Sequence, residues 1–156
     1  MKKRNIDSVP TTALSPTHEW LDVEALADVE ITSEHTSHPI ESALLAGRGP
    51  GWRAAGPGRQ TIRILFTHPQ PLRQIRLTFH EPKVERTQEY VLRWSPDRGQ
   101  SFQEIVRQQW NFSPSAEREE ENYDVDIPAA TVLELKIIPD LSRGEARASL
   151  DTLRVA

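Results

Sequence analysis

Residues 88–109 read QEYVLRWSPDRGQSFQEIVRQQ, and this stretch predicts a β-hairpin. Tyr90, Leu92 and Trp94 lie at every second position, a period that is typical of a half-buried strand. The segment SPDRG at 95–99 favours a tight turn, because proline suits the second position of a type I turn and glycine supplies a positive φ. Residues 102–109 are then expected to return as the partner strand.

The sequence on both sides of this hairpin predicts further short strands. Apolar and polar residues alternate over 61–67 and 72–80, and a Pro-Gln-Pro turn at 69–71 separates the two. Strands with the same alternation are expected at 122–127, 131–138 and 149–155. Seven or eight short strands with almost no helix indicate an all-β fold, an antiparallel β-sandwich of the jelly-roll kind.

The first 59 residues contain three segments of different character. Residues 1–17 lack apolar periodicity and predict a flexible leader, so that the sandwich domain is expected over 18–156. Over 21–31 glutamate and alanine favour a helix, but the apolar set lies on every second residue and no cap is visible, so we expect a strand. Residues 32–59 predict a long loop with one helical turn at 40–45, and loops of this length are often functional.

Composition and charge exclude several classes of protein. The 156 residues include no cysteine, which excludes a disulfide scaffold, a thiolate metal site and a cysteine nucleophile. Residues 5–46 carry eight acids and no Lys or Arg, whereas 47–113 carry eleven bases against five acids. We expect these arginines to form a solvated face of the strands. Residues 6–14 carry Asp7 where a secretory signal needs an apolar run, so a cytoplasmic location is expected.

Several blocks of the sequence resemble the discoidin, or galactose-binding-like, domain superfamily. They are SAL at 42–44 with the glycines that follow, WRAAG at 52–56, the strand at 60–66, YVLRWSPDRG at 90–99, and ASLDTLRV at 148–155. Their order matches the superfamily over residues 20–156. The resemblance implies a β-sandwich whose Trp52 and Trp94 pack in the core.

The resemblance also implies a binding module, and carbohydrate is the first expectation for its ligand. Loops can vary without disturbing a rigid sandwich, and the loops expected to be functional are 33–59, 80–87, 108–121 and 139–148. A sugar site needs a flat apolar plate beside amide or charged groups, which residues 108–112 offer. The candidate ligand-binding residues are Trp110, Asn111, Phe112, Arg86, His35, His38 and Arg143. Alternatively, Trp110 and Phe112 cap the end of the core beneath the acidic loop.

A second hypothesis is docking to protein or DNA. The segment 52–62 resembles the amino-terminal domain of the eukaryotic single-strand-break repair scaffold, which binds nicked DNA and a repair polymerase. This hypothesis rests on the basic middle of the chain, because phosphate contacts are made by Lys and Arg. The contact residues would be Arg53, Arg59, Arg63, Arg73, Arg76 and Arg86.

Metal binding and catalysis are not expected. The turn at 45–47 lacks the aspartate that holds a structural calcium in many modules of the superfamily, and Thr152 lies where a glutamate is common. His35 and His38 have the spacing of two zinc ligands, but no third ligand is identifiable nearby. The acidic run at 117–121 predicts a solvated loop. No catalytic or cofactor motif is present, so we expect no enzyme and no cofactor.

Overall fold

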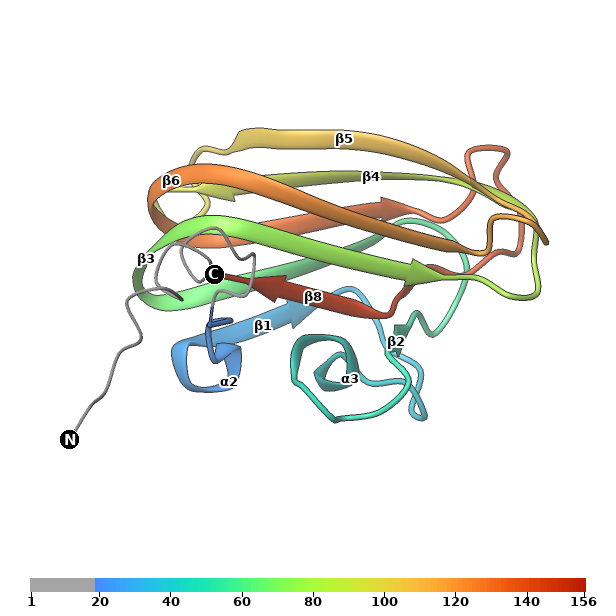
Figure 1. Ribbon diagram of the computed structural model, residues 1–156, viewed down its shortest axis with the longest axis horizontal. Helices are drawn as coiled ribbons and strands as arrows, with labels where there is room; N and C mark the ends of the chain where they lie inside the picture. Colours follow the sequence, from blue (N-terminus) through green and yellow to red (C-terminus); the bar gives the residue numbers. More distant parts are fainter. Residues whose placement is uncertain (1–18) are drawn as a thin grey trace, which may run out of the picture.

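The computed structural model describes residues 19–156, so the predicted leader at 1–17 lies outside the described residues (Figure 1). Eight strands and two short helices are described there. In chain order they are α2 (Val23–Leu26), β1 (Ala27–Ile31), α3 (Glu41–Leu44), β2 (Trp52–Arg53), β3 (Gln60–His80), β4 (Arg86–Ser95), β5 (Gln103–Phe112), β6 (Arg118–Ile138), β7 (Ser149–Leu150) and β8 (Thr152–Val155). The predicted all-β, antiparallel β-sandwich is confirmed.

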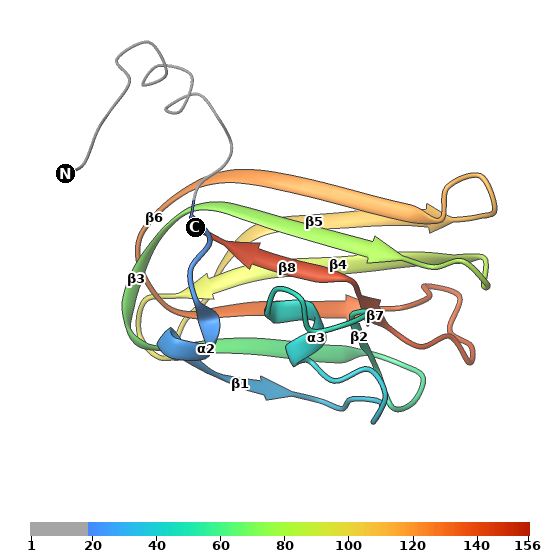
Figure 2. The same ribbon diagram turned by 60° about the horizontal axis from the view of Figure 1, so that its bottom comes forward.

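Two long strands, β3 and β6, belong to both layers of the sandwich. Their first and second halves lie in different layers, and both ribbons bend sharply at the same end of the molecule (Figures 1 and 2). One layer has the order β1-β3-β6-β4-β5, and in the other layer β8 pairs with the second half of β3. A small sheet of β2 and β7 completes the fold.

The bend in β3 corrects one sequence prediction. We expected two strands separated by a turn at 69–71, but Gln60–His80 is a single strand whose halves do not pair with each other. Its register with β6 is interrupted between Leu65 and Gln74, where Pro69 and Pro71 cannot donate a backbone N–H. The prolines therefore mark a corner between layers rather than a hairpin.

The segment before β1 corrects another prediction. Residues 21–31 were expected to form one strand, but α2 occupies Val23–Leu26 and β1 begins only at Ala27. The cap that the sequence seemed to lack is Asp22, whose side chain accepts a hydrogen bond from the Ala25 N–H at 3.3 Å. The helical turn expected at 40–45 is confirmed as α3. None of the helices in residues 19–156 is long and apolar enough to cross a membrane.

The core lies between the layers and is made by the inward-facing residues of each strand. Trp52 is 1% exposed, as expected, and Phe66 and Phe79 are fully buried. Trp94 is only partly buried and packs against this core. The rigid frame carries the connecting segments at its two ends.

The segments 80–87, 108–121 and 139–148 meet at one end of the sandwich, opposite the two bends, and 33–59 reaches this end at β2 but also forms α3 on the flank (Figures 1 and 2). Backbone hydrogen bonds join them there: Ala54 N–H donates to Ala148 O, Glu81 N–H to Glu117 O, and Leu141 N–H to Thr87 O. We call this region the loop end. Exposed large apolar side chains among residues 19–156 occur only here, at Val84 and Leu141.

Candidate functional site

Arg86, at the start of β4, is buried beneath the loop end. Its Nε donates to Glu81 Oε1 at 2.9 Å, its Nη1 to Pro139 O at 2.9 Å, and its Nη2 approaches Ser149 Oγ at 3.3 Å. The guanidinium lies 4.6 Å from the ring centre of Phe112. Burial lowers the pKa of Arg86, and the hydrogen bond that Arg86 donates to Glu81 opposes that shift.

This network corrects two of the predicted ligand contacts. The side chain of Arg86 is 0% exposed and Phe112 is 2% exposed, so neither reaches the surface. Arg86 instead ties the 81–85 loop, the 139–148 loop and β7 together. Its function in this structure is to hold the loop end in place.

Trp110 and Asn111 point to opposite sides of β5, as neighbours in a strand must. Trp110 packs against the core, and its Nε1 donates to Ala116 O at 3.3 Å. Trp110 and Phe112 thus both pack against the core, as the alternative interpretation expected, although the acidic run is a strand rather than a loop above them. Asn111 is exposed and its Oδ1 accepts from Thr87 Oγ1 at 2.8 Å. The predicted aromatic and amide cluster does not form one surface.

A cleft of about 170 Å³ opens at the loop end between β2, β7 and the end of β3. We call it the end cleft. It is lined by His38, Pro50, Trp52, Arg53, His80, Pro82, Ser149, Leu150 and Asp151. Of these, His38 was a predicted ligand-binding residue and Arg53 a predicted docking contact. The residues other than His38 lie in three segments that only the fold brings together.

Backbone contacts fix the walls of the end cleft. Arg53 N–H donates to His38 O at 3.2 Å, and His35 N–H donates to Arg53 O at 2.7 Å. Arg53 is paired with Ser149 across the β2–β7 sheet. Gly51 permits this approach: a Cβ there would lie 2.8 Å from Leu150 O, and its φ is +95°.

The polar side chains of the end cleft have spare hydrogen-bonding capacity. Within residues 19–156, the half-buried guanidinium of Arg53 makes no hydrogen bond or ion pair. His80 Nε2 lies 3.5 Å from Glu117 Oε1. Asp151 Oδ2 lies 3.6 Å from Arg118 Nη1. These separations are long for hydrogen bonds, so a bound ligand can compete for the same groups.

The remaining predicted residues lie around this end without forming a metal site. The rings of His35 and His38 meet edge to face at 5.6 Å, and His35 Nδ1 accepts from the Ser37 N–H. Arg143 is exposed in the 139–148 loop with a φ of 59° and lines a separate hollow. Across residues 19–156 no three His, Cys, Asp or Glu side chains are placed to share a metal ion. Thr152 Oγ1 lies 2.6 Å from Thr78 Oγ1, across the β3–β8 pair.

The acidic run at 117–121 is not the solvated loop that we expected. Residues from Arg118 onward continue strand β6, so alternate side chains face inward and Glu119 is 0% exposed. Gln88 Nε2 donates to Glu119 Oε1 at 3.3 Å. Burial, together with the neighbouring Glu121, raises the pKa of Glu119 to about 8.

Several arginines of the basic middle of the chain are paired with carboxylates. Arg63 Nε donates to the buried Glu134 at 2.7 Å, Arg73 pairs with Asp126, and Arg86 pairs with Glu81. The expectation of a solvated face holds for Arg63 and Arg73, which are 42% and 58% exposed. Three of the six arginines of the docking hypothesis are therefore paired with carboxylates.

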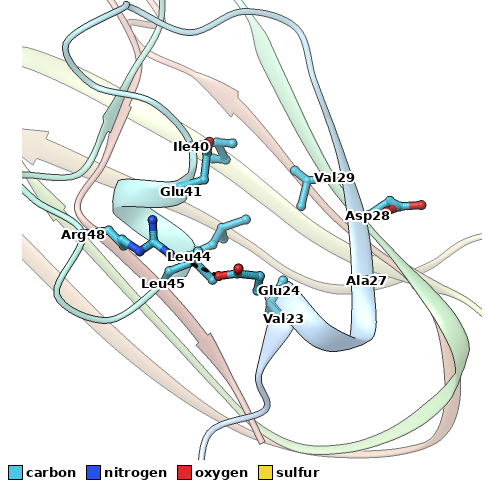
Figure 3. A pocket seen from close by; sticks show the side chains of 10 residues that line it. All are labelled: Val23, Glu24, Ala27, Asp28, Val29, Ile40, Glu41, Leu44, Leu45 and Arg48. Carbon is cyan, nitrogen blue, oxygen red and sulfur yellow. Dashed lines mark hydrogen bonds and ion pairs between the residues drawn. The ribbon is translucent and has the colours of Figure 1, made fainter.

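A second hollow, of about 430 Å³, lies on the flank of the sandwich between β1 and α3 (Figure 3). Aliphatic side chains make its floor, and Arg48 Nη2 lies 3.4 Å from Glu24 Oε2 at its rim. Its one arginine is thus already paired. Its other charged lining residues, Asp28 and Glu41, are acidic, so among residues 19–156 this hollow lacks an unpaired cation.

Comparisons with known proteins establish the fold. No protein-family model and no curated protein matches the sequence. The CBM32 module of AlyQ, solved with 4,5-unsaturated mannuronic acid, matches with a TM-score of 0.64 at 15% identity, over 89% of this chain and 98% of that one.

Two modules from Clostridium perfringens match as well. CpGH89CBM32-5, solved with GalNAc-β-1,3-galactose, has a TM-score of 0.63 at 18% identity over 88% of this chain and 99% of that one. The family 32 module of NanJ, solved with galactose, has a TM-score of 0.63 at 16% identity over 87% and 96%. The expected discoidin-like fold is confirmed, whereas the likeness to the repair scaffold is not shown. Some matching modules are parts of larger enzymes, such as AlyQ with its alginate lyase domain.

Proposed function

We propose that this chain is a non-catalytic carbohydrate-binding module whose ligand binds in the end cleft. The observation that carries the proposal is the fold, which is that of CBM32 modules solved with sugars bound. The loop end supplies the second support, because it gathers a cleft, unpaired polar side chains and exposed apolar ones on a rigid frame.

The end cleft has the chemistry that a sugar requires. Hydroxyl groups need both donors and acceptors, which the His38 and His80 rings, Arg53 and Asp151 provide. The rings of Pro50 and Pro82 add apolar surface for the C–H groups of a pyranose. The cleft is small, so we expect one sugar ring to enter it and the affinity to be modest.

The shallow hollow beside Asn111 is less suitable. Asn111 Oδ1 is engaged by Thr87, and Asp140 Oδ1 accepts from both the N–H and the hydroxyl of Ser142. Arg86 lines that hollow without presenting its buried side chain. A sugar bound there would have to displace existing hydrogen bonds. A sugar in the end cleft would have fewer such hydrogen bonds to displace.

An NMR titration tests the proposal. The unmodified chain is titrated with methyl glycosides of galactose, N-acetylgalactosamine and glucose, and with the corresponding uronates, up to about 10 mM, because millimolar Kd values are expected for a small site. We expect saturable shifts at residues of the end cleft for at least one sugar. His80→Ala should weaken that binding by about tenfold or more, as expected for loss of a polar contact.

His68→Ala is the matched control, because His68 is an exposed histidine at the corner of β3, at the other end of the sandwich. This variant should bind as the unmodified chain does. Absence of saturable shifts with every sugar would refute the proposal. Equal loss of binding in His80→Ala and His68→Ala would remove the end cleft as the site.

A further inference from the structure

We infer that the end cleft selects an acidic sugar, a hexuronic acid whose carboxylate pairs with Arg53. This inference rests on the proposed function and names the class of ligand.

Arg53 is a cation of the end cleft that forms no ion pair among residues 19–156. Its backbone N–H and C=O are both bonded to the 35–38 turn, so the residue is held in place. Its side chain is half-buried and makes no ion pair within residues 19–156. A guanidinium withdrawn from water in this way gains most from an anion, because the planar group binds a carboxylate through two parallel hydrogen bonds.

The acids nearest to the end cleft already have other partners. Glu81 is bonded to Arg86 at 2.9 Å, Asp151 faces Arg118 at 3.6 Å, and Glu117 faces His80 at 3.5 Å. None of these carboxylates forms an ion pair with Arg53, and Arg118 is shared between Asp151 and Glu120. Among residues 19–156, Arg53 is therefore the arginine of the end cleft whose guanidinium has no carboxylate within ion-pairing distance.

A second guanidinium strengthens the field at this point. Arg53 is paired across the small sheet with Ser149, and Ser149 Oγ accepts from Arg86 Nη2 at 3.3 Å. Burial lowers the pKa of Arg86, and the charge of Arg53 adds to this lowering to a smaller extent. An anion bound at Arg53 would relieve this repulsion, whereas a neutral hydroxyl would not.

The other groups of the end cleft suit the rest of a uronate ring. His38, His80 and Asp151 remain available for hydroxyls, and a cleft of about 170 Å³ is smaller than a typical drug-sized ligand pocket, so it fits one ring. A neutral sugar can use the same hydroxyl contacts. We therefore expect the uronate to bind more tightly than the neutral sugar, and Arg53 should determine the ratio of the two affinities.

Two matched pairs of ligands test the inference. Methyl galactopyranosiduronate is compared with methyl galactopyranoside, and methyl glucopyranosiduronate with methyl glucopyranoside, by NMR titration at pH 7 in low and high salt. We expect one uronate to bind about tenfold more tightly than its neutral partner, as expected for gaining a charge-assisted pair, with the advantage shrinking in high salt.

Arg53→Gln should abolish the difference between uronate and neutral sugar while keeping the neutral sugar bound. Arg53→Lys keeps the positive charge but loses the planar guanidinium, so it should retain part of the difference between uronate and neutral sugar. Arg107→Gln, at an exposed arginine on β5, is the control and should keep the full preference. Because three variants are compared, failure of one to fold still leaves the preference of the unmodified chain measured.

The possible failures are distinguishable. If the neutral sugars bind as tightly as the uronates, the inference is overturned and the proposed function survives. If Arg53→Gln keeps the preference for the uronate, the carboxylate is not bound by Arg53 and the inference is overturned. If neither member of either pair binds, the proposed function fails with it.

Discussion

Gly51 determines how closely β2 approaches β7, and therefore the shape of the end cleft. We predict that Gly51→Ala destabilises the fold by about 1–3 kcal/mol, because the new Cβ would meet backbone atoms of Leu150 and Asp151 at a φ that alanine rarely adopts. Urea unfolding measures the change. Gly144→Ala is the control: a Cβ there has nothing within 4 Å, so its midpoint should stay close to that of the unmodified chain.

Glu119 should make the stability of the fold depend on pH. The native state holds its proton up to a pKa of about 8, whereas the unfolded carboxyl ionises near 4.5. Between these values the native state binds more protons than the unfolded state, so the free energy of unfolding falls as pH rises from about 4.5 to about 8. Glu119→Gln keeps the shape of the protonated acid and should remove much of this fall.

Unfolding of both proteins in urea across pH 4 to 9 checks that prediction, and about 1.4 kcal/mol per pH unit is the steepest fall that one group can cause. Glu120→Gln, at an exposed neighbour on the same strand, should follow the unmodified chain. Parallel curves for Glu119→Gln and the unmodified chain would show that Glu119 is not the source.

The site residues show what a sequence can and cannot reveal. Trp52 was correctly expected in the core, because its place in the resemblance to the discoidin superfamily is that of a packed residue. Arg86 and Arg53 look alike in the sequence, yet one is buried against Glu81 and the other lines the end cleft. Their environments differ because β7 and the 81–85 loop pack against Arg86. No local sequence pattern encodes that packing.

Among the strands, the corner of β3 needs its own support. Arg98, in the β4–β5 turn, donates from its guanidinium to Phe66 O and, at 3.0 Å, to Thr67 O, where the ladder with β6 is interrupted. We predict that Arg98→Ala costs about 1–3 kcal/mol, because two backbone carbonyls lose charged donors. Arginine and alanine at position 98 would adopt the same φ of 61°, so the change in the free energy of unfolding reports the loss of the arginine side chain.

Thermal and urea unfolding measure the effect of Arg98→Ala. The matched control is Arg107→Ala, because Arg107 is 55% exposed and is bonded to the carboxylates of Glu89 and Glu104 rather than to backbone carbonyls. It should change the unfolding midpoint little. An Arg98→Ala variant as stable as this control would mean that the corner of β3 does not depend on the hydrogen bonds from Arg98.

Strand positions could be predicted from the sequence better than strand continuity. A period of two located every long strand, because one face of each packs on the core. It could not show that 61–67 and 72–80 are one strand, since a Pro-Gln-Pro segment suits a turn and a corner equally well. The single helical turn at Val23–Leu26 was missed because four residues are too few for a helical period to appear.

The whole sandwich pairs its basic strand β3 with acidic neighbours, and this bears on the docking hypothesis. Arg63 and Arg73 face Glu134 and Asp126 on β6, so their charges are largely neutralised. We predict no binding of gapped DNA at about 150 mM salt, where scattered charges are screened beyond about 8 Å. A fluorescence anisotropy titration checks this. Tight binding that weakens steeply with salt would contradict it.

The most direct test of recognition at the loop end is a crystal structure of the chain with methyl galactopyranosiduronate, or with whichever glycoside titrates most tightly, at a concentration well above its Kd. The account predicts one sugar ring in the end cleft, with oxygens within hydrogen-bonding distance of Arg53 and His80. A ring bound between β1 and α3, or on the outer face of the five-stranded layer, with the end cleft empty, would contradict it.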